Sequence, residues 1–229
     1  MAANPVPRDA GKMRAFADHL IEGLHLHGDA IGIRQNTEAV MRVTNAAAGT
    51  AEAQAGQALA ARAAAYAALA AADDAGRIKL LDCKLRLAMK IGQRWNADWE
   101  PTGFPDRSTA VPRTMDPRYI LLGSLKGYFT ARPEHESTEV GATAALCEAA
   151  QTVLHDARLA VRQSESAVIE AIHARRTAVK TLRKRCRGLV KELFQLIPRD
   201  DPRWNSFGLK IPASPLETTD AEPGDGEQG

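Results

Sequence analysis

Apolar side chains recur along the second half of the chain at alternating spacings of four and three residues, the rhythm of one face of an α-helix. The stronger run is a coiled-coil-like seam with one polar position. Its members are Val168, Ile172, Arg175, Val179, Leu182, Cys186, Leu189, Leu193 and Leu196. The preceding run has the same rhythm but smaller side chains: Val140, Thr143, Cys147, Ala150, Leu154, Ala157, Val161 and Ser164. We expect two helices, folded into an antiparallel pair by a turn near residues 162–166.

One order of features occurs twice, which predicts an internal duplication. In each copy a leucine lies thirteen residues before a Thr-Glu pair, first at Leu24 and again at Leu125. A long stretch of Ala, Leu and charged residues follows, and after it comes an Arg-Trp-Asn triplet, at 94–96 and at 203–205. Each copy therefore predicts a short helix, a loop, a long helical stretch and an aromatic segment.

Capping signals set the boundaries of these elements. Gly28 and Pro133 are typical of helix ends, whereas Asn, Ser and Thr side chains accept the first free N–H groups of a helix. The predicted short helices cover about residues 12–27 and 118–130, and the long stretches begin at Asn36 or Thr37 and at Ser137.

The hairpin turn of the first copy has two candidate positions. Analogy with the second copy favours residues 49–56, where two glycines lie. The Asp-Asp-Ala-Gly sequence at 73–76 is the stronger local breaker, because glycine costs most in a helix and aspartate favours caps. We favour the earlier turn, with a kink at Gly76.

Together these elements predict an all-α protein, in which two tandem helical-hairpin repeats form an elongated antiparallel helical bundle or coiled coil. The acidic tail is rich in Gly and Pro and is expected to be disordered. The predicted division is a flexible N-terminus at 1–11, repeat 1 with a proline-rich connector at 12–117, repeat 2 at 118–212 and the tail at 213–229.

Composition narrows the possible classes of function. Apolar residues make up 45% of the chain but aromatic residues only 5%, so the core must rely on alanine. The net charge of +2 gives the whole molecule no strong attraction to anions. We expect no secretory signal and no membrane-spanning helix. Three widely separated cysteines are most simply reduced thiols, which favours the cytoplasm.

Two Glu-x-x-His pairs resemble the ligand spacing of di-iron helical bundles, at Glu22/His25 and Glu170/His173. The seam, however, places Glu170 and His173 on the outer side of their helix, and a di-iron site also needs two inward-facing glutamates. We therefore predict no metal site, no cofactor and no catalytic residue, and hence a protein that is not an enzyme.

Basic residues cluster in two predicted helical segments, at 77–94 and 175–191. Brought together, two basic helices could bind phosphates of a nucleic acid. The simpler interpretation is a solvated face whose counter-charges lie on neighbouring helices or on the acidic tail. The candidate phosphate contacts are Arg176, Lys180, Arg183, Lys184 and Arg187.

Aromatic residues follow each long stretch at once. Large rings at these positions can cover the end of an alanine-rich hairpin, and this capping role is favoured over a carbohydrate or peptide platform. The predicted caps are Trp95, Trp99, Trp204 and Phe207.

The chain resembles a set of bacterial duplicated helical proteins with no established function. The resemblance rests on the triplet at 94–96 with Gly103-Phe104 and Ser108–Pro112, and on the segments 182–190 and 200–212. Some similar chains continue into fibronectin-type modules after the equivalent of Pro212. The resemblance covers most of the chain but implies no activity and no site residues.

We therefore expect a non-enzymatic helical scaffold or protein-interaction module, acting on a partner protein or on a second copy of itself through the seam. The alternative is a nucleic-acid-associated protein that uses the two basic segments.

Overall fold

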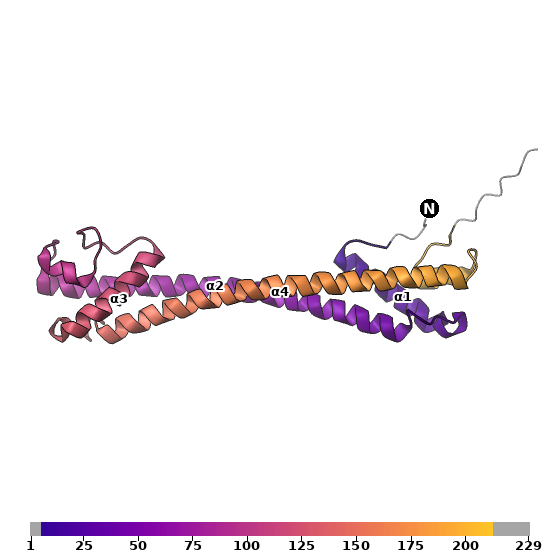
Figure 1. The fold of residues 1–229 in the computed structure, drawn as a ribbon, viewed down its shortest axis with the longest axis horizontal. Coiled ribbons are helices and arrows are strands. Elements are labelled where there is room, and N and C mark those ends of the chain that lie inside the picture. Colours follow the sequence, from indigo (N-terminus) through magenta and orange to yellow (C-terminus); the bar gives the residue numbers. More distant parts are fainter. Residues whose placement is uncertain (1–5, 213–229) are drawn as a thin grey trace, which may run out of the picture. The chain divides into compact units, whose positions relative to one another are not determined.

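The computed structural model describes residues 6–212, and this part of the chain is all-α, as predicted (Figure 1). The four α-helices are α1 (Ala10–Ile31), α2 (Glu38–Ile91), α3 (Met115–Ala131) and α4 (Ala144–Leu196). Two short 3-10 helices lie between them, η1 (Ala97–Thr102) after α2 and η2 (Pro133–His135) after α3, and a third, η3 (Pro202–Phe207), follows α4. Within 6–212 extended pairing is limited to one bridge between Ser137 and Ala142. The predicted disordered tail, 213–229, lies outside the described residues.

The long helices α2 and α4 are each continuous, so the turns predicted at 49–56 and 162–166 are wrong. Residues 162–166 contain no glycine or proline, and the step from Ser164 to Val168 is four residues, so the two predicted seams join without a break. In α2 the helix also runs unbroken through 73–76. Each interior glycine costs about 1 kcal/mol relative to alanine, and packing on neighbouring helices offsets that cost.

The described chain forms two compact units, and each combines segments from both predicted copies. Unit 1 comprises residues up to 54 together with those from 172, and unit 2 comprises residues 55–171. The long helices α2 and α4 therefore each contribute to both units. The 3-10 helix that follows one long helix contacts the short helix that precedes the other, η3 on α1 and η1 on α3. The duplication stays a prediction, but its copies do not coincide with the compact units.

The core of unit 1 is formed where α1, the first part of α2 and the last part of α4 meet (Figure 1). The predicted seam of α4 lies in this core from Leu182 to Leu193, but the next member, Leu196, is 44% exposed. Ile197 is buried in its place. The fully buried side chains of α1, α2 and α4 here are Met13, Ala17, Leu20, Met41, Ala48, Leu182, Cys186, Leu189 and Leu193.

The core of unit 2 is built from α3, the last part of α2 and the first part of α4. Short helix α3 supplies most of its large side chains, and α4 supplies small ones, as its predicted seam indicated. The fully buried members are Leu80, Cys83, Leu87, Trp99, Leu122, Leu125, Phe129, Ala142 and Cys147.

Several predicted helix boundaries move. Helix α1 begins at Ala10, inside the segment predicted to be flexible, because the Asp9 side chain accepts the Lys12 N–H. It passes through Gly28 and ends at Ile31. Gly32 caps it in the left-handed conformation that favours glycine (φ 84°).

Helix α4 begins at Ala144 rather than at Ser137. Ser137 instead exchanges backbone hydrogen bonds with Ala142 across a turn. Two other side chains cap the first turn of the helix: the Thr143 hydroxyl oxygen accepts from Leu146 N, and a Glu136 carboxylate oxygen accepts from Ala144 N.

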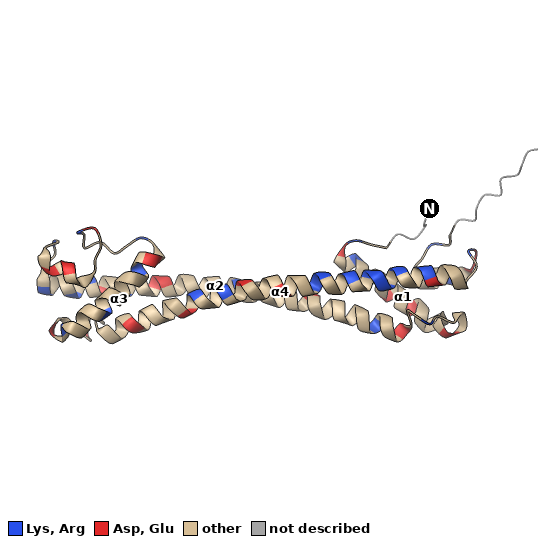
Figure 2. Ribbon diagram, in the orientation of Figure 1, with Lys and Arg blue, Asp and Glu red and all other residues tan. Residues whose placement is uncertain are grey.

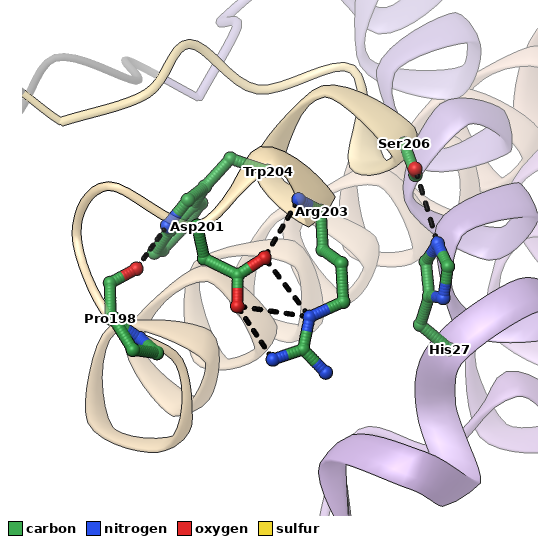
Figure 3. A network of polar contacts seen from close by, with 6 residues as sticks. All are labelled: His27, Pro198, Asp201, Arg203, Trp204 and Ser206. Atoms are coloured by element: carbon green, nitrogen blue, oxygen red, sulfur yellow. Dashed lines mark hydrogen bonds and ion pairs between the residues drawn. The ribbon is translucent and has the colours of Figure 1, made fainter.

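The aromatic segments close both units in the same way. The indole N–H of Trp204 donates to the carbonyl of Pro198 (2.9 Å), and that of Trp99 donates to the carbonyl of Gly92 (3.0 Å). Both carbonyls lie just beyond a long helix, and both rings are fully buried. Figure 3 shows the unit 1 segment, where His27 of α1 also bonds to Ser206.

Phe207 of η3 is fully buried and lies against Gly23 of α1, where an added Cβ would come within 2.4 Å of its ring. Trp95, by contrast, is only partly buried. Three of the four predicted caps are therefore core residues, and they cover the short helices.

Candidate binding surfaces

The Glu-x-x-His pairs lie at the surface. Glu170 and His173 are exposed, as the seam predicted, and so are Glu22 and His25. His25 Nδ1 lies 3.3 Å from a carboxylate oxygen of Glu38. Across residues 6–212 no three His, Cys, Asp or Glu side chains gather as metal ligands would. In the same range, no helix combines the length and apolar character needed to cross a bilayer.

A basic face runs along the last part of α4, in unit 1 (Figure 2). At about 100° per residue, six of its Lys and Arg side chains fall within an arc of roughly 100°, to one side of the buried seam. From Arg176 to Lys191 the helix rises roughly 22 Å. These residues, Arg176, Lys180, Arg183, Lys184, Arg187 and Lys191, are called the basic face below.

The charges of the basic face are not neutralised within the described part of the chain. None of the six forms an ion pair with an acidic side chain of residues 6–212. Arg183 donates to the backbone carbonyl of Arg8. The neighbouring acid, Glu192, already accepts the backbone N–H groups of residues 34–36. Neighbouring helices therefore do not supply the counter-charges that a solvated face would be expected to have.

The other predicted basic segment, 77–94 of α2, differs because several of its cations hold the fold together. Arg77 pairs with Asp74, and Lys79 donates to Asp82 and to the carbonyl of Gly141. Arg86 donates to the carbonyls of 135 and 136. The segment lies in unit 2, so the two basic helices do not belong to one compact unit.

A second surface, which the sequence analysis missed, is a mainly apolar stripe on α2 in unit 2, with one charged residue, Asp74, in it. It lies opposite the core-facing side of the helix, covers an arc of roughly 80° and extends for roughly 43 Å. Its large side chains are 42–70% exposed. The stripe, called the outer face below, consists of Ala60, Ala63, Ala67, Ala71, Ile78, Leu81, Leu85 and Met89, all exposed.

The signal for the outer face is present in the sequence but is masked by a second pattern. Apolar residues at 76, 80, 83 and 87 face the core, while those at 78, 81, 85 and 89 face away from it. A helix that is apolar on two opposite sides shows little amphipathic contrast. Asp74 is the single charged residue within the arc of the outer face.

The α4 seam, which we expected to be free for self-association, is occupied within the chain itself. Leu182, Leu189 and Leu193 are fully buried against α1 and α2 in unit 1. Any contact with another chain must therefore use a different surface.

No protein-family model matches the chain, and no curated protein or solved structure is significantly similar to it. A functional proposal must therefore come from its own surfaces, such as the outer face and the basic face.

Proposed function

We propose that this protein is a non-enzymatic helical scaffold that self-associates, with two copies pairing through the outer face of α2. The observation that carries the proposal is the row Ile78, Leu81, Leu85 and Met89, all large, apolar and exposed on one side of a helix whose opposite side is already buried. Contiguous exposed apolar surface of this kind is typical of protein–protein contact sites.

A second copy is the occupant that the spacing favours. The outer face repeats at intervals of three and four residues, apart from one interval of seven that contains Asp74. This pattern packs best against a helix with the same repeat. A symmetric pair supplies such a helix, because each copy then presents the same patch. The alanines at 60–71 allow two backbones to approach closely along the rest of the stripe.

The expected pair is weak. Eight large side chains, each with about half of its surface still to bury, contribute roughly 6–12 kcal/mol. Loss of translational and rotational freedom costs roughly 4–15 kcal/mol. The two are similar in size, so contact along the alanine part must decide the affinity, and we expect dissociation in the micromolar range.

The test is sedimentation of the full chain over a range of concentrations, comparing wild type with Leu81→Glu/Leu85→Glu. We expect the wild type to reach a dimer and the double variant to remain monomeric. Val43→Glu is the matched control, since Val43 is 71% exposed on α2 but lies in unit 1. A wild type that stays monomeric at the highest concentration would overturn the proposal, and circular dichroism checks that all variants keep their helices.

Binding of nucleic acid through the basic face is the second candidate function. It is favoured by six cations on one side of α4 with no acidic partner in residues 6–212. A single nucleic-acid strand places roughly six phosphates along 22 Å at 3.4 Å each, which matches the number of cations. Such binding is electrostatic, weakens with salt and reads no sequence.

Two neighbouring residues allow a matched test of this candidate. Lys184 lies on the basic face, whereas Arg185 is exposed on the other side of the same helix. In a gel-shift titration with a short single-stranded DNA, we expect Lys184→Glu to weaken binding about tenfold, equivalent to about 1.4 kcal/mol, and Arg185→Glu to have much less effect. Equal losses from the two variants, or no shift at low salt, would remove nucleic-acid binding from consideration.

Removal of residues 213–229 tests the remaining interpretation of the basic face. That segment carries five acidic residues and no Lys or Arg. If the acidic segment neutralises the basic face, a chain ending at Pro212 binds the same DNA more tightly than the full chain.

We also propose a cytoplasmic location, on the grounds that all three cysteines are free thiols.

A further inference from the structure

Two cysteines that are far apart in the sequence meet inside unit 2. Cys83 of α2 and Cys147 of α4 are 64 positions apart, yet their Sγ atoms are 3.5 Å apart. Both side chains are fully buried, in the core formed with α3. Two thiols in contact can be joined by one covalent bond, whereas isolated buried cysteines serve only as small apolar residues.

The surroundings of this pair favour a thiolate on Cys147. The hydrogen bond between the two sulfurs lowers the pKa of Cys147, although burial acts in the opposite direction. The pKa of Cys83 is raised by the same hydrogen bond and by burial.

One further group stabilises negative charge on Cys147, against the Glu136 carboxylate, which raises the pKa of this thiol. The Lys79 ammonium, held by Asp82 and the carbonyl of Gly141, adds a nearby positive charge. The pair thus holds two sulfurs in contact, of which that of Cys147 is the more acidic.

Cys186 in unit 1 provides an internal comparison. It is equally buried, but no second thiol lies beside it in the described part of the chain. Burial raises the pKa of its thiol to about 12. It therefore has the ordinary properties of a cysteine in an apolar core.

We propose that Cys83 and Cys147 form a redox-active dithiol, which a peroxide converts into a disulfide that joins α2 to α4. The Cys147 thiolate attacks one oxygen of hydrogen peroxide, which breaks the O–O bond and gives a sulfenic acid and hydroxide. Cys83 sulfur then attacks the sulfenic sulfur, and the S–O bond breaks. Each oxygen leaves as water, so two thiols and one peroxide give one disulfide and two waters.

Peroxide is the oxidant that suits this position. Both sulfurs are enclosed by the core, and a small uncharged molecule can reach them through modest local opening. A bulky disulfide reagent would need the two helices to separate. In a reducing compartment the pair stays as thiols, and under peroxide it becomes a covalent link between two long helices.

The test uses the full chain under native conditions. The protein is treated with hydrogen peroxide, quenched with catalase, unfolded and alkylated, and its thiols are counted by intact mass. We expect wild type to lose the mass of two hydrogen atoms and to keep one alkylatable cysteine, Cys186. Peptide mapping should then recover a fragment linking Cys83 to Cys147.

Two variants separate the possible results. Cys186→Ala should form the same link and retain no alkylatable thiol, and Cys147→Ala should form no internal link and retain two. Retention of all three thiols in wild type, addition of oxygen to cysteine without a link, or disulfides only between chains would each overturn the proposal. Because the decisive count is made on the wild type, a folding defect in Cys147→Ala would not affect it.

Discussion

Units 1 and 2 are assembled from the same kinds of parts but present different surfaces. Each has a short helix, a segment of α2, a segment of α4 and a 3-10 helix whose tryptophan donates to a carbonyl at a long-helix end. Unit 1 carries the basic face. Unit 2 carries the apolar outer face and the pair of thiols. The comparison shows that two units with the same internal packing can expose different residues, so each unit can have a separate function.

The tryptophans provide the strongest test of the shared design. We expect Trp204→Ala to destabilise unit 1 and Trp99→Ala to destabilise unit 2, each by about 3–5 kcal/mol, because a fully buried ring is lost from a core. Hydrogen exchange followed by mass spectrometry should show faster exchange in residues 6–54 and 172–212 for the first variant. For the second it should show faster exchange in residues 55–171. If either variant loosened both units equally, their division would be wrong.

Oxidation of the dithiol should raise the stability of unit 2 and leave that of unit 1 unchanged, whereas the tryptophan variants lower stability. A link between positions 83 and 147 restricts the unfolded chain and should stabilise unit 2 by about 4 kcal/mol in the chain-entropy model. Unit 1 should keep its stability, since its thiol has no partner beside it. Urea unfolding of oxidised and reduced protein, monitored by exchange in each unit, measures the difference. A fall in the stability of unit 2 on oxidation would mean that the link strains the helices.

Two helical glycines make a smaller, matched comparison. Gly23→Ala in unit 1 should cost about 1–3 kcal/mol, because the new Cβ would lie 2.4 Å from the Phe207 ring and 2.9 Å from its Cα. Gly127→Ala in unit 2 meets nothing within 4 Å and should instead stabilise α3 by about 0.5–1 kcal/mol. Thermal unfolding of the two variants measures both. Destabilisation by Gly127→Ala would show that other atoms pack against α3 at position 127.

The smallest effect concerns pH and is confined to unit 1. Burial alone would raise the pKa of Glu192, but hydrogen bonds from residues 34–36 lower it below its ordinary value of 4.5. A carboxyl whose pKa is depressed on folding stabilises the fold above that ordinary value, and the stability is lost as the pH falls through the folded-state pKa. Glu192→Gln should therefore cost about 1 kcal/mol at neutral pH and progressively less below pH 4.5.

Urea unfolding at several pH values measures this difference. Glu148→Gln is the control, because Glu148 forms an exposed pair with Lys126 in unit 2 and should contribute little at any pH. A loss that stayed constant from neutral to acid pH would show that packing, rather than charge, explains the role of Glu192.

The all-α class could be predicted from residue spacing alone, and so could the exposure of Glu170 and His173. The continuity of α2 and α4 through the two predicted turns could not be predicted in this way. Folding each predicted copy on itself requires a break near Arg162, but α4 continues there because its inward-facing positions keep their spacing of three and four residues from Leu154 to Val168. The segments that pack against each helix are distant from it in the sequence, and the spacing of residues within one helix does not identify them.

The candidate surfaces were predictable to different degrees. Charge clustering identified the basic face, but the sequence could not distinguish Lys184 from Arg86, which is used by the fold. The outer face was hidden because Leu85 and Leu87 are both apolar and only the structure shows which is buried. The contact of Cys83 with Cys147 depends on the register between α2 and α4, which spacing within one helix does not set.

Contact of η3 with α1 has a consequence for the order of folding. Unit 1 is made from the two ends of the described chain, whereas unit 2 comes from one contiguous stretch. During synthesis, residues 55–171 are made as one stretch, but Gly23 contacts Phe207, which is made 184 residues later. Contacts between such distant residues form slowly because a long loop must close first. We therefore expect unit 2 to form first, and unit 1 only after its second segment has been made.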